Sequence, residues 1–260
     1  MDFGMPYLLE MHSIEECCAL AHELGLSFVE LNANFPDCLL EQLDPAELHQ
    51  LGRRYGVYFT LHIEEECNPF TFNSMVRAAW LKSCRHALGI ASALQMPVVN
   101  MHFPKGDYVT LPDRRVCMFE RYADVFHAEL QAFRAMCEEA LSDTNTRIAI
   151  ENTNGWKPYE QQAIEYLLES PVFGLTLDIG HCHGVDNVDE SFFCKHEDRL
   201  IHMHGHDGMG RKNHLALGDG EIKLRERFAW AKRCGARVVL ETKTIQALRT
   251  SVTRLPEFLT

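Results

Sequence analysis

The sequence predicts an α/β fold, a single (β/α)8 TIM barrel, and two observations lead to it. Seven short hydrophobic runs alternate with amphipathic stretches of helix length, and their β-branched and bulky residues are typical of buried parallel strands. Each run ends in a carboxylate or a histidine: Glu30, His62, His102, Glu151, Asp178, His204 and Glu241. Packing alone does not require such residues at the same place on strand after strand. A barrel, in contrast, gathers the carboxyl ends of its strands at one mouth.

In the first half of the chain, helix caps and breakers separate the apolar runs. Ser13 and Glu16 form a capping-box signal for a helix that reaches Leu24 and stops at Gly25. Asp44 is a good N-cap for the next helix, and Gly56 closes it. Strands are therefore expected at Phe3–Leu9, Leu26–Leu31, Val57–Ile63 and Pro97–His102, and the later helices at Pro45–Tyr55 and at about Phe72–Leu94.

The second half repeats the alternation. A loop over Phe103–Asp113 precedes a long helical pattern, and a second, glycine-rich loop spans Gly205 to Gly220. Strands are expected at Arg147–Asn152, Val172–Ile179, Leu200–His204 and Ala236–Glu241. Helices are expected at Arg114–Leu141, Tyr159–Glu169, Val188–His196 and Glu221–Cys234, followed by a last helix that ends near Pro256.

Eight strands that alternate with helices, without a hairpin signal between them, predict parallel pairing. A closed barrel and an open doubly wound sheet both satisfy this pattern. The barrel is favoured because ligand-type residues end nearly every strand, whereas an open sheet concentrates its site at a switch point. The sequence has neither GxGxxG after a strand nor GxxxxGK[ST], so no nucleotide cofactor is expected.

Composition narrows the class of protein. The 260 residues suit one barrel, and no linker or low-complexity tract divides residues 1–260, so a single domain is expected. The formal charge is −12, with 37 acidic against 25 basic residues, which argues against a nucleic-acid partner. No apolar stretch approaches the length of a membrane span, and the start of the chain lacks the pattern of a secretory signal.

The ten cysteines are scattered, and no CxxC pair occurs. Most fall in helical or strand patterns. They are interpreted as buried free thiols of a cytoplasmic protein rather than as a disulfide framework.

The strongest candidate site consists of Glu151, Asp178, His204 and Glu241. Three carboxylates and one imidazole suit Mn²⁺, Mg²⁺, Fe²⁺ or Zn²⁺, and the carboxylates would offset the charge of the ion. Each residue alone would more often cap a strand or pair with a neighbouring Lys or Arg. Four of them at the same strand position favour a divalent metal ion.

Other residues at the same mouth are candidates for secondary roles. His62 and His102 end their strands in the same register, where they would complete a second metal site or bind a substrate oxygen. His181 lies three residues after Asp178 and is expected to contact substrate. Three histidines alternate at positions 202, 204 and 206; we expect His202 to lie below His204 as support, and His206 at or beyond the rim.

The glycine-rich loop adds two more candidates. Asp207 is expected to be a loop or supporting acid. His214 is either a substrate contact or a loop anchor. The acidic residues of LGDGE disfavour a phosphate cradle. Glu30 would either reach the site rim or form a structural ion pair.

The order Glu30, LHI, NMH, IENT, LDIGH, HMHGHD, NHLALGDGEI and LE resembles the xylose-isomerase-like TIM-barrel superfamily over almost the whole chain. That superfamily contains sugar and sugar-phosphate isomerases and epimerases, and relatives of endonuclease IV. In the epimerase branch, the positions of Glu151, Asp178, His204 and Glu241 hold the metal. The two glutamates there also act as acid and base, and the position of His181 contacts substrate.

In the endonuclease IV branch, positions matching His62 and His102 join Glu151 at one zinc, and His181 joins an Asp-x-His motif at a third zinc. This chain keeps His214 but has Lys212 where that aspartate would stand. The resemblance therefore implies a metal-dependent isomerase or epimerase of a small sugar or sugar phosphate. The alternatives are a zinc phosphodiesterase of endonuclease IV type (AP endonuclease family 2), a lyase similar to inosose dehydratases, and a non-enzymatic sugar-binding barrel. Barrels of this kind often form homo-oligomers, which leaves a dimer or tetramer open here.

Overall fold

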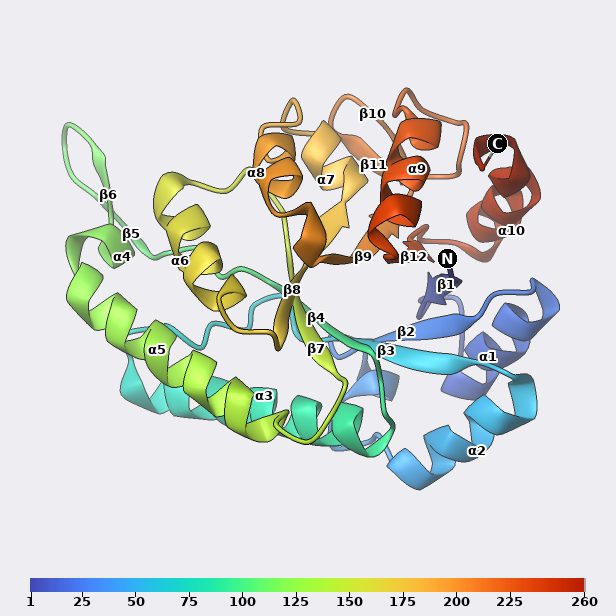
Figure 1. Cartoon of the computed structure of the whole chain (residues 1–260), viewed down its shortest axis with the longest axis horizontal. Helices are drawn as coiled ribbons and strands as arrows, with labels where there is room; N and C mark the ends of the chain where they lie inside the picture. The colour runs from blue at the N-terminus through green and yellow to red at the C-terminus, as the bar shows by residue number, and fades with distance from the viewer. Residues whose placement is uncertain (260) are drawn as a thin grey trace.

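A closed barrel of eight parallel strands forms the centre of the computed structural model, which describes residues 1–259 (Figure 1). The strands are hydrogen-bonded in the order β1-β12-β9-β8-β7-β4-β3-β2. This confirms the predicted (β/α)8 barrel. The strand bounds are β1 (Phe3–Pro6), β2 (Phe28–Asn32), β3 (Tyr58–His62), β4 (Val98–His102), β7 (Arg147–Glu151), β8 (Phe173–Asp178), β9 (Leu200–Gly205) and β12 (Arg237–Leu240).

Helices follow the strands, and several begin at the predicted caps. The Ser13 side chain accepts a hydrogen bond from the backbone N–H of Glu16, and Asp44 accepts one from Ala46. Gly25 and Gly56 both adopt a positive φ of 68°, which ends the first two helices. The larger helices are α1 (Ile14–Glu23), α2 (Pro45–Tyr55), α3 (Ser74–Ala93), α5 (Ala123–Ala140), α6 (Pro158–Leu168), α9 (Leu224–Cys234) and α10 (Ile245–Arg254).

Two loops contain antiparallel hairpins that the sequence pattern did not indicate. Tyr108–Thr110 (β5) pairs antiparallel with Arg115–Cys117 (β6), and this hairpin projects beyond the helices in Figure 1. The predicted helix Arg114–Leu141 therefore starts later, with α4 (Met118–Arg121) and then α5 after a break at Tyr122. Short alternating runs with β-branched residues pair once a turn brings them together, and three-residue strands give too weak a periodic signal to predict.

The second hairpin lies in the predicted loop Gly205–Gly220, where β10 (Asp207–Met209) pairs with β11 (Lys212–Leu215). Two short helices, α7 (Ile179–His183) and α8 (Glu190–Lys195), precede β9, and α7 begins directly at the end of β8. None of the helices within residues 1–259 combines the length and the hydropathy needed to cross a membrane. All ten cysteines are free thiols, and eight of them are buried.

Two faces of each strand have different chemistry, and this difference positions the site. Apolar residues such as Leu31, Met101 and Leu177 belong to the hydrophobic core cluster that the helices cover. On β2, β3, β4, β7, β8 and β9, polar residues occupy alternate positions near the carboxyl ends, and most of them are buried. These polar side chains form two tiers inside the barrel. The lower tier consists of Glu30, Thr60, Asn100, Thr176 and His202, and the upper tier consists of His62, His102, Glu151, Asp178, His204 and Glu241.

Candidate metal centre

The upper tier brings the four predicted ligand residues to one point. Nδ1 of His204 lies 3.1 Å from Oε2 of Glu241, 3.3 Å from Oε1 of Glu151 and 3.8 Å from Oδ2 of Asp178. Ligand atoms of Glu151, Asp178 and His204 all lie within 4.8 Å of one another. Glu241 follows β12, and its backbone N–H donates to the Gly205 carbonyl at 3.1 Å, which continues the ladder and turns the side chain inward.

Unsatisfied atoms at this point test whether a cation would fit. Nδ1 of His204 and Oε2 of Glu241 are buried and have no hydrogen-bond partner among the described residues. Buried polar atoms are normally paired, so two such atoms facing each other need an explanation. A divalent ion would accept the lone pairs of both. Three carboxylates and one imidazole nitrogen are also a donor set that Mn²⁺, Mg²⁺, Fe²⁺ or Zn²⁺ accepts. The residues present therefore fit a divalent ion.

The lower tier orients His204. Oε1 of Glu30 lies 2.8 Å from Nε2 of His204, as an ion-pair contact without hydrogen-bond geometry, and Oε2 of Glu30 is hydrogen-bonded to Nε2 of His202 at 2.8 Å. The Thr60 hydroxyl donates to the same Oε2 at 3.0 Å. A carboxylate at Nε2 favours the proton on that nitrogen and leaves the Nδ1 lone pair free for a metal. Glu30 thus forms a buried ion pair and does not reach the rim, and His202 lies beneath His204.

A second cluster shares Glu151. Nε2 of His62 and Nε2 of His102 lie 3.3 and 3.6 Å from Oε2 of Glu151, so one carboxylate faces both clusters with different oxygens. Nδ1 of His62 donates to the Ile63 carbonyl at 2.7 Å, and Nε2 faces Glu151. The amide of Asn100 donates a short hydrogen bond to the same Oε2 and accepts one from Thr176 at 2.6 Å. This second set has the ligand types of a metal site, as the sequence suggested.

Pairs of opposite charge dominate the electrostatics of the site. Burial alone would raise the pKa of Glu151 and of Glu241, but the His204 imidazole and other neighbours outweigh it and hold both pKa values well below the usual range. Burial would lower the pKa of His204, yet Glu151, Glu241 and Glu30 raise it well above its ordinary value. Burial would also lower the pKa of His62, but the hydrogen bond and the charge of Glu151 raise this pKa to about 9.

The turn after β8 positions His181. Oδ1 of Asp178 caps α7 by accepting the backbone N–H of His181 at 2.6 Å. Asn152, the asparagine of the IENT motif, accepts the N–H of Asp178 at 2.9 Å and donates to its carbonyl at 3.1 Å. Nδ1 of His181 lies 3.2 Å from the Asn152 carbonyl, so it carries a proton and leaves Nε2 free. Asn152 was not among the predicted site residues, although its place after Glu151 is a usable signal.

His206 is the main residue that sequence reasoning misplaced. It is fully buried instead of lying at the rim, and its Nε2 is 3.2 Å from both carboxylate oxygens of Asp178. The alternation of positions 202, 204 and 206 was the signal for an inward direction. Its ring also lies against His214, with centroids 4.4 Å apart. His214 in turn donates Nδ1–H to the Glu241 carbonyl at 3.1 Å, and burial lowers the pKa of His214 to about 4.

Asp207 organises the loop instead of facing the site. Its two carboxylate oxygens accept backbone N–H groups from Gly208, Gly218, Gly220 and Ile222 at 2.8 to 3.1 Å. The glycine-rich segment therefore wraps around an internal anion, which agrees with the expectation that it is not a phosphate cradle. At the end of β12, Lys243 pairs with Oε1 of Glu241 at 2.8 Å.

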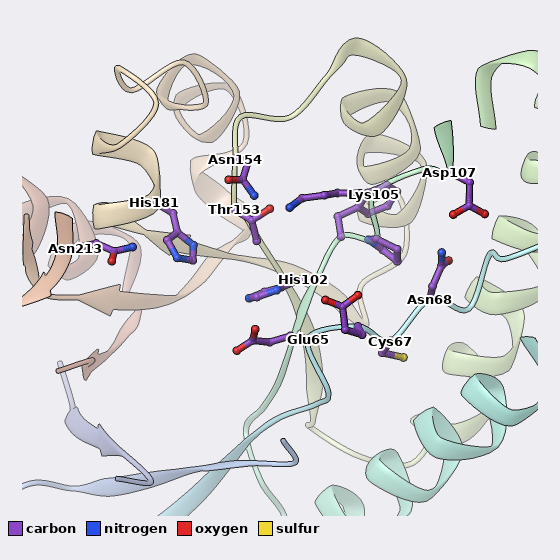
Figure 2. A pocket seen from close by; sticks show the side chains of 13 residues that line it. Glu65, Cys67, Asn68, His102, Lys105, Asp107, Thr153, Asn154, His181 and Asn213 are labelled. Atoms are coloured by element: carbon purple, nitrogen blue, oxygen red, sulfur yellow. The ribbon is translucent and has the colours of Figure 1, made fainter. Parts of the chain in front are cut away.

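A cavity of about 430 Å³ opens beside the centre (Figure 2). This volume lies in the range of small-molecule sites, about 300–1,000 Å³. His102 and His181 form its inner wall, and the Lys105 side chain extends toward Thr153 and Asn154 in the view of Figure 2. The remaining polar wall consists of Glu65, Glu66, Asn68, Asp107 and Asn213. Such mixed donors and acceptors suit a ligand with several hydroxyl groups.

Comparisons with known proteins agree with the barrel fold. An uncharacterized protein of Methanocaldococcus jannaschii, MJ1614, is 24% identical over 220 residues, which are 81% of each chain. A solved D-tagatose 3-epimerase-like protein has a TM-score of 0.80 at 24% identity and covers 100% of this chain and 97% of its own. The 3-keto-D-glucoside 4-epimerase YcjR from E. coli has a TM-score of 0.76 at 14% identity, with 99% and 98% covered.

At these identities the similarity to solved structures shows the fold. The family follows from the sequence itself, because the family model described as a xylose isomerase-like TIM barrel matches residues 18–258. The chain therefore belongs to the xylose isomerase-like TIM barrel family.

Proposed function

We propose that this protein is a divalent-metal-dependent isomerase or epimerase of a small sugar or sugar phosphate. One observation carries the proposal: Glu151, at the end of β7, and Glu241, directly after β12, approach the same nitrogen of His204 at 3.3 and 3.1 Å. Two carboxylates that reach one cation position from different parts of the barrel can exchange protons with a bound substrate from two directions. The epimerases among the structural relatives and the neighbouring polar cavity support this reading.

Glu151, Asp178, His204 and Glu241 would hold the ion. When bound, a divalent ion supplies Lewis-acid polarisation of a carbonyl and a neighbouring hydroxyl of the sugar. One of the two glutamates then removes the proton from the carbon next to the carbonyl, which gives an enediolate of the substrate. The other glutamate returns a proton to the opposite face, giving the epimer, or to the adjacent carbon, giving the isomer.

Neighbouring groups prepare the two glutamates for proton transfer. Glu151 is buried and Glu241 is partly buried, and the imidazoles around them favour the ionised form that a base requires. The glutamate that acts as the acid must carry a proton before it returns one to the substrate. Lys243 holds one oxygen of Glu241, and Asn100 holds one oxygen of Glu151, so each carboxylate has a fixed orientation. His181 and His214 each donate Nδ1–H to a backbone carbonyl, and each keeps Nε2 for a substrate hydroxyl.

Solvent exchange tests the proposal directly. Manganese-loaded protein is incubated in D₂O with a panel of ketoses, aldoses and their phosphates, and deuterium at carbon is followed by NMR. We expect incorporation with at least one sugar and the appearance of its epimer or isomer. Glu151→Gln should abolish both, while Glu120→Gln on the exposed side of α4 serves as the control. Turnover at the wild-type rate in Glu151→Gln would remove this residue from the mechanism. A dehydrated product would indicate the lyase.

A zinc phosphodiesterase is the second candidate, because His62, His102 and Glu151 form an additional metal-type cluster. It requires at least two ions and cleavage of DNA at abasic sites. Elemental analysis that finds a single ion would exclude it. Strand cleavage by the zinc-loaded protein, together with no deuterium in any sugar, would instead replace the epimerase proposal.

A further inference from the structure

His206 is tied to the candidate metal centre through both of its ring nitrogens. Nδ1 accepts the backbone N–H of His214 at 2.9 Å, and Nε2 faces the two oxygens of Asp178 at 3.2 Å each. His206 also belongs to a group with His214 and Glu241 that has the residue types of a metal site. Since both nitrogens already have partners, acting as a ligand would require His206 to give up one of them.

The backbone contact fixes the tautomer of the ring. A backbone N–H is always a donor, so the nitrogen that it meets must offer a lone pair. The Asp207 carbonyl lies 3.2 Å from the same Nδ1 and would favour a proton there, but the His214 N–H is nearer, at 2.9 Å. The proton therefore belongs on Nε2, which donates it to Asp178.

Two site residues depend on this arrangement. Oδ1 of Asp178 accepts the His181 N–H, and both of its oxygens face Nε2 of His206, so these contacts restrain the orientation of the carboxylate. His214 has a positive φ of 56°, an uncommon backbone conformation for a residue with a side chain. The hydrogen bond from its N–H to His206 stabilises that conformation and keeps its ring against Glu241.

The glycine of the DIGH motif leaves room for the ring. A Cβ atom added at Gly180 would overlap Cε1 of His206 and approach Nδ1 to 2.7 Å. The turn after Asp178 is therefore built around a buried imidazole at position 206. This close fit is independent of the hydrogen bonds and agrees with them.

We propose that His206 is a positioning residue that orients Asp178 toward the divalent ion and holds the His214 loop against the substrate cavity. The inference rests on the proposed function for the identity of the ion and the substrate. It assigns no direct contact between His206 and either of them. It links two steps of the reaction, ion binding and substrate binding, to one side chain outside the predicted ligand set.

The test uses variants that separate hydrogen bonding from volume. His206→Leu fills similar space without a donor or an acceptor, whereas His206→Gln keeps one of each. Mn²⁺ is titrated into metal-free protein with calorimetry, and the visible spectrum of the Co²⁺-loaded protein reports the ligand geometry. We expect His206→Leu to bind Mn²⁺ about 10–100-fold more weakly, to change the Co²⁺ spectrum and to raise KM for the sugar. His206→Gln should recover most of the affinity.

His183→Leu is the matched control, because His183 lies on the same turn but pairs with Glu221 at 3.0 Å. It should keep wild-type Mn²⁺ affinity. If His206→Leu does not fold, Gly180→Ala is the alternative variant. It keeps the imidazole of His206 but forces the ring to move, and the same loss of Mn²⁺ affinity is expected. Wild-type Mn²⁺ affinity in His206→Leu or in Gly180→Ala would overturn the inference.

The two proposals fail in different ways. Wild-type protein that binds Mn²⁺ but exchanges no sugar proton would overturn the proposed function, while the effect of His206 on Mn²⁺ affinity would still support its role. Sugar exchange in the wild type, combined with unchanged affinity and KM in His206→Leu, would overturn only the role of His206.

Discussion

Replacing Glu30 by glutamine tests how the lower tier controls the candidate metal centre. Glu30 is buried, and its two oxygens contact His204, His202 and Thr60 at 2.8, 2.8 and 3.0 Å. Glutamine has nearly the same size but presents one NH₂ group in place of an acceptor. Where that NH₂ meets Nε2 of His204, the ring proton moves to Nδ1, the atom that should bind the ion. Where it meets His202 and Thr60, it opposes two donors.

The expected magnitudes follow from these contacts. Removing one partner of a buried ion pair costs about 3–5 kcal/mol, and because glutamine keeps one acceptor we expect about 3 kcal/mol in the free energy of unfolding of metal-free protein. Loss of a group that orients a metal ligand weakens metal binding about 10–100-fold, or about 1.4–2.8 kcal/mol. Both effects should appear together, since the same carboxylate causes them.

Two measurements check this prediction. Urea unfolding of metal-free protein gives the stability, and calorimetric titration with Mn²⁺ gives the affinity. Glu15→Gln is the control, because its partner Arg54 lies at 2.6 Å but both side chains are largely exposed, and such pairs contribute little. Glu30→Gln with wild-type Mn²⁺ affinity would refute the idea that this carboxylate selects the tautomer of His204.

Two further predictions concern loops around the site. In Asp207→Asn, an amide replaces a carboxylate that accepts four backbone N–H groups, and leaving even one of them unpaired costs about 1–3 kcal/mol. Hydrogen exchange measured by mass spectrometry should then be faster in residues 216–222, and unchanged exchange there would contradict the role given to Asp207. Asp189 accepts the Trp156 N–H at 2.7 Å, its second oxygen is buried without a partner, and burial raises its pKa. The folded state therefore favours the protonated form of Asp189. The stability linked to this proton is fully present below the unfolded-state pKa, near 3.8, and is lost as pH rises through the folded-state pKa. Asp189→Asn should therefore be more stable than wild type in urea at pH 7.5, with a smaller advantage at pH 4.5; an equal difference at both pH values would show that charge is not the cause.

The network beneath the site explains why the barrel interior is polar. Thr176 donates to Asn100, Asn100 donates to Glu151, and Thr60 donates to Glu30. The first two contacts form a chain that ends on Glu151, a carboxylate of the candidate centre, and the third ends on Glu30, which lies against His204. Buried polar groups are costly unless they are satisfied, and here they satisfy one another. Polar residues therefore replace apolar packing in this part of the interior, and their hydrogen bonds fix the orientation of Glu151 and Glu30.

The sequence alone determined the barrel and the residues at its mouth, because both depend on local periodicity. Strand positions follow from short apolar runs, and the parallel topology then gathers Glu151, Asp178, His204 and Glu241 at one end whatever the details of packing. The same pattern failed for the two hairpins, because strands of three or four residues carry almost no periodic signal.

Only the tertiary structure decided which atom of each side chain faces the centre. The free nitrogen of His204 depends on Glu30, which lies 174 positions earlier in the chain, and the depth of His206 depends on the space left by Gly180. The sequence does not specify the tautomer of a histidine. Its proton is assigned by contacts from other strands, and these contacts exist only once the barrel has closed.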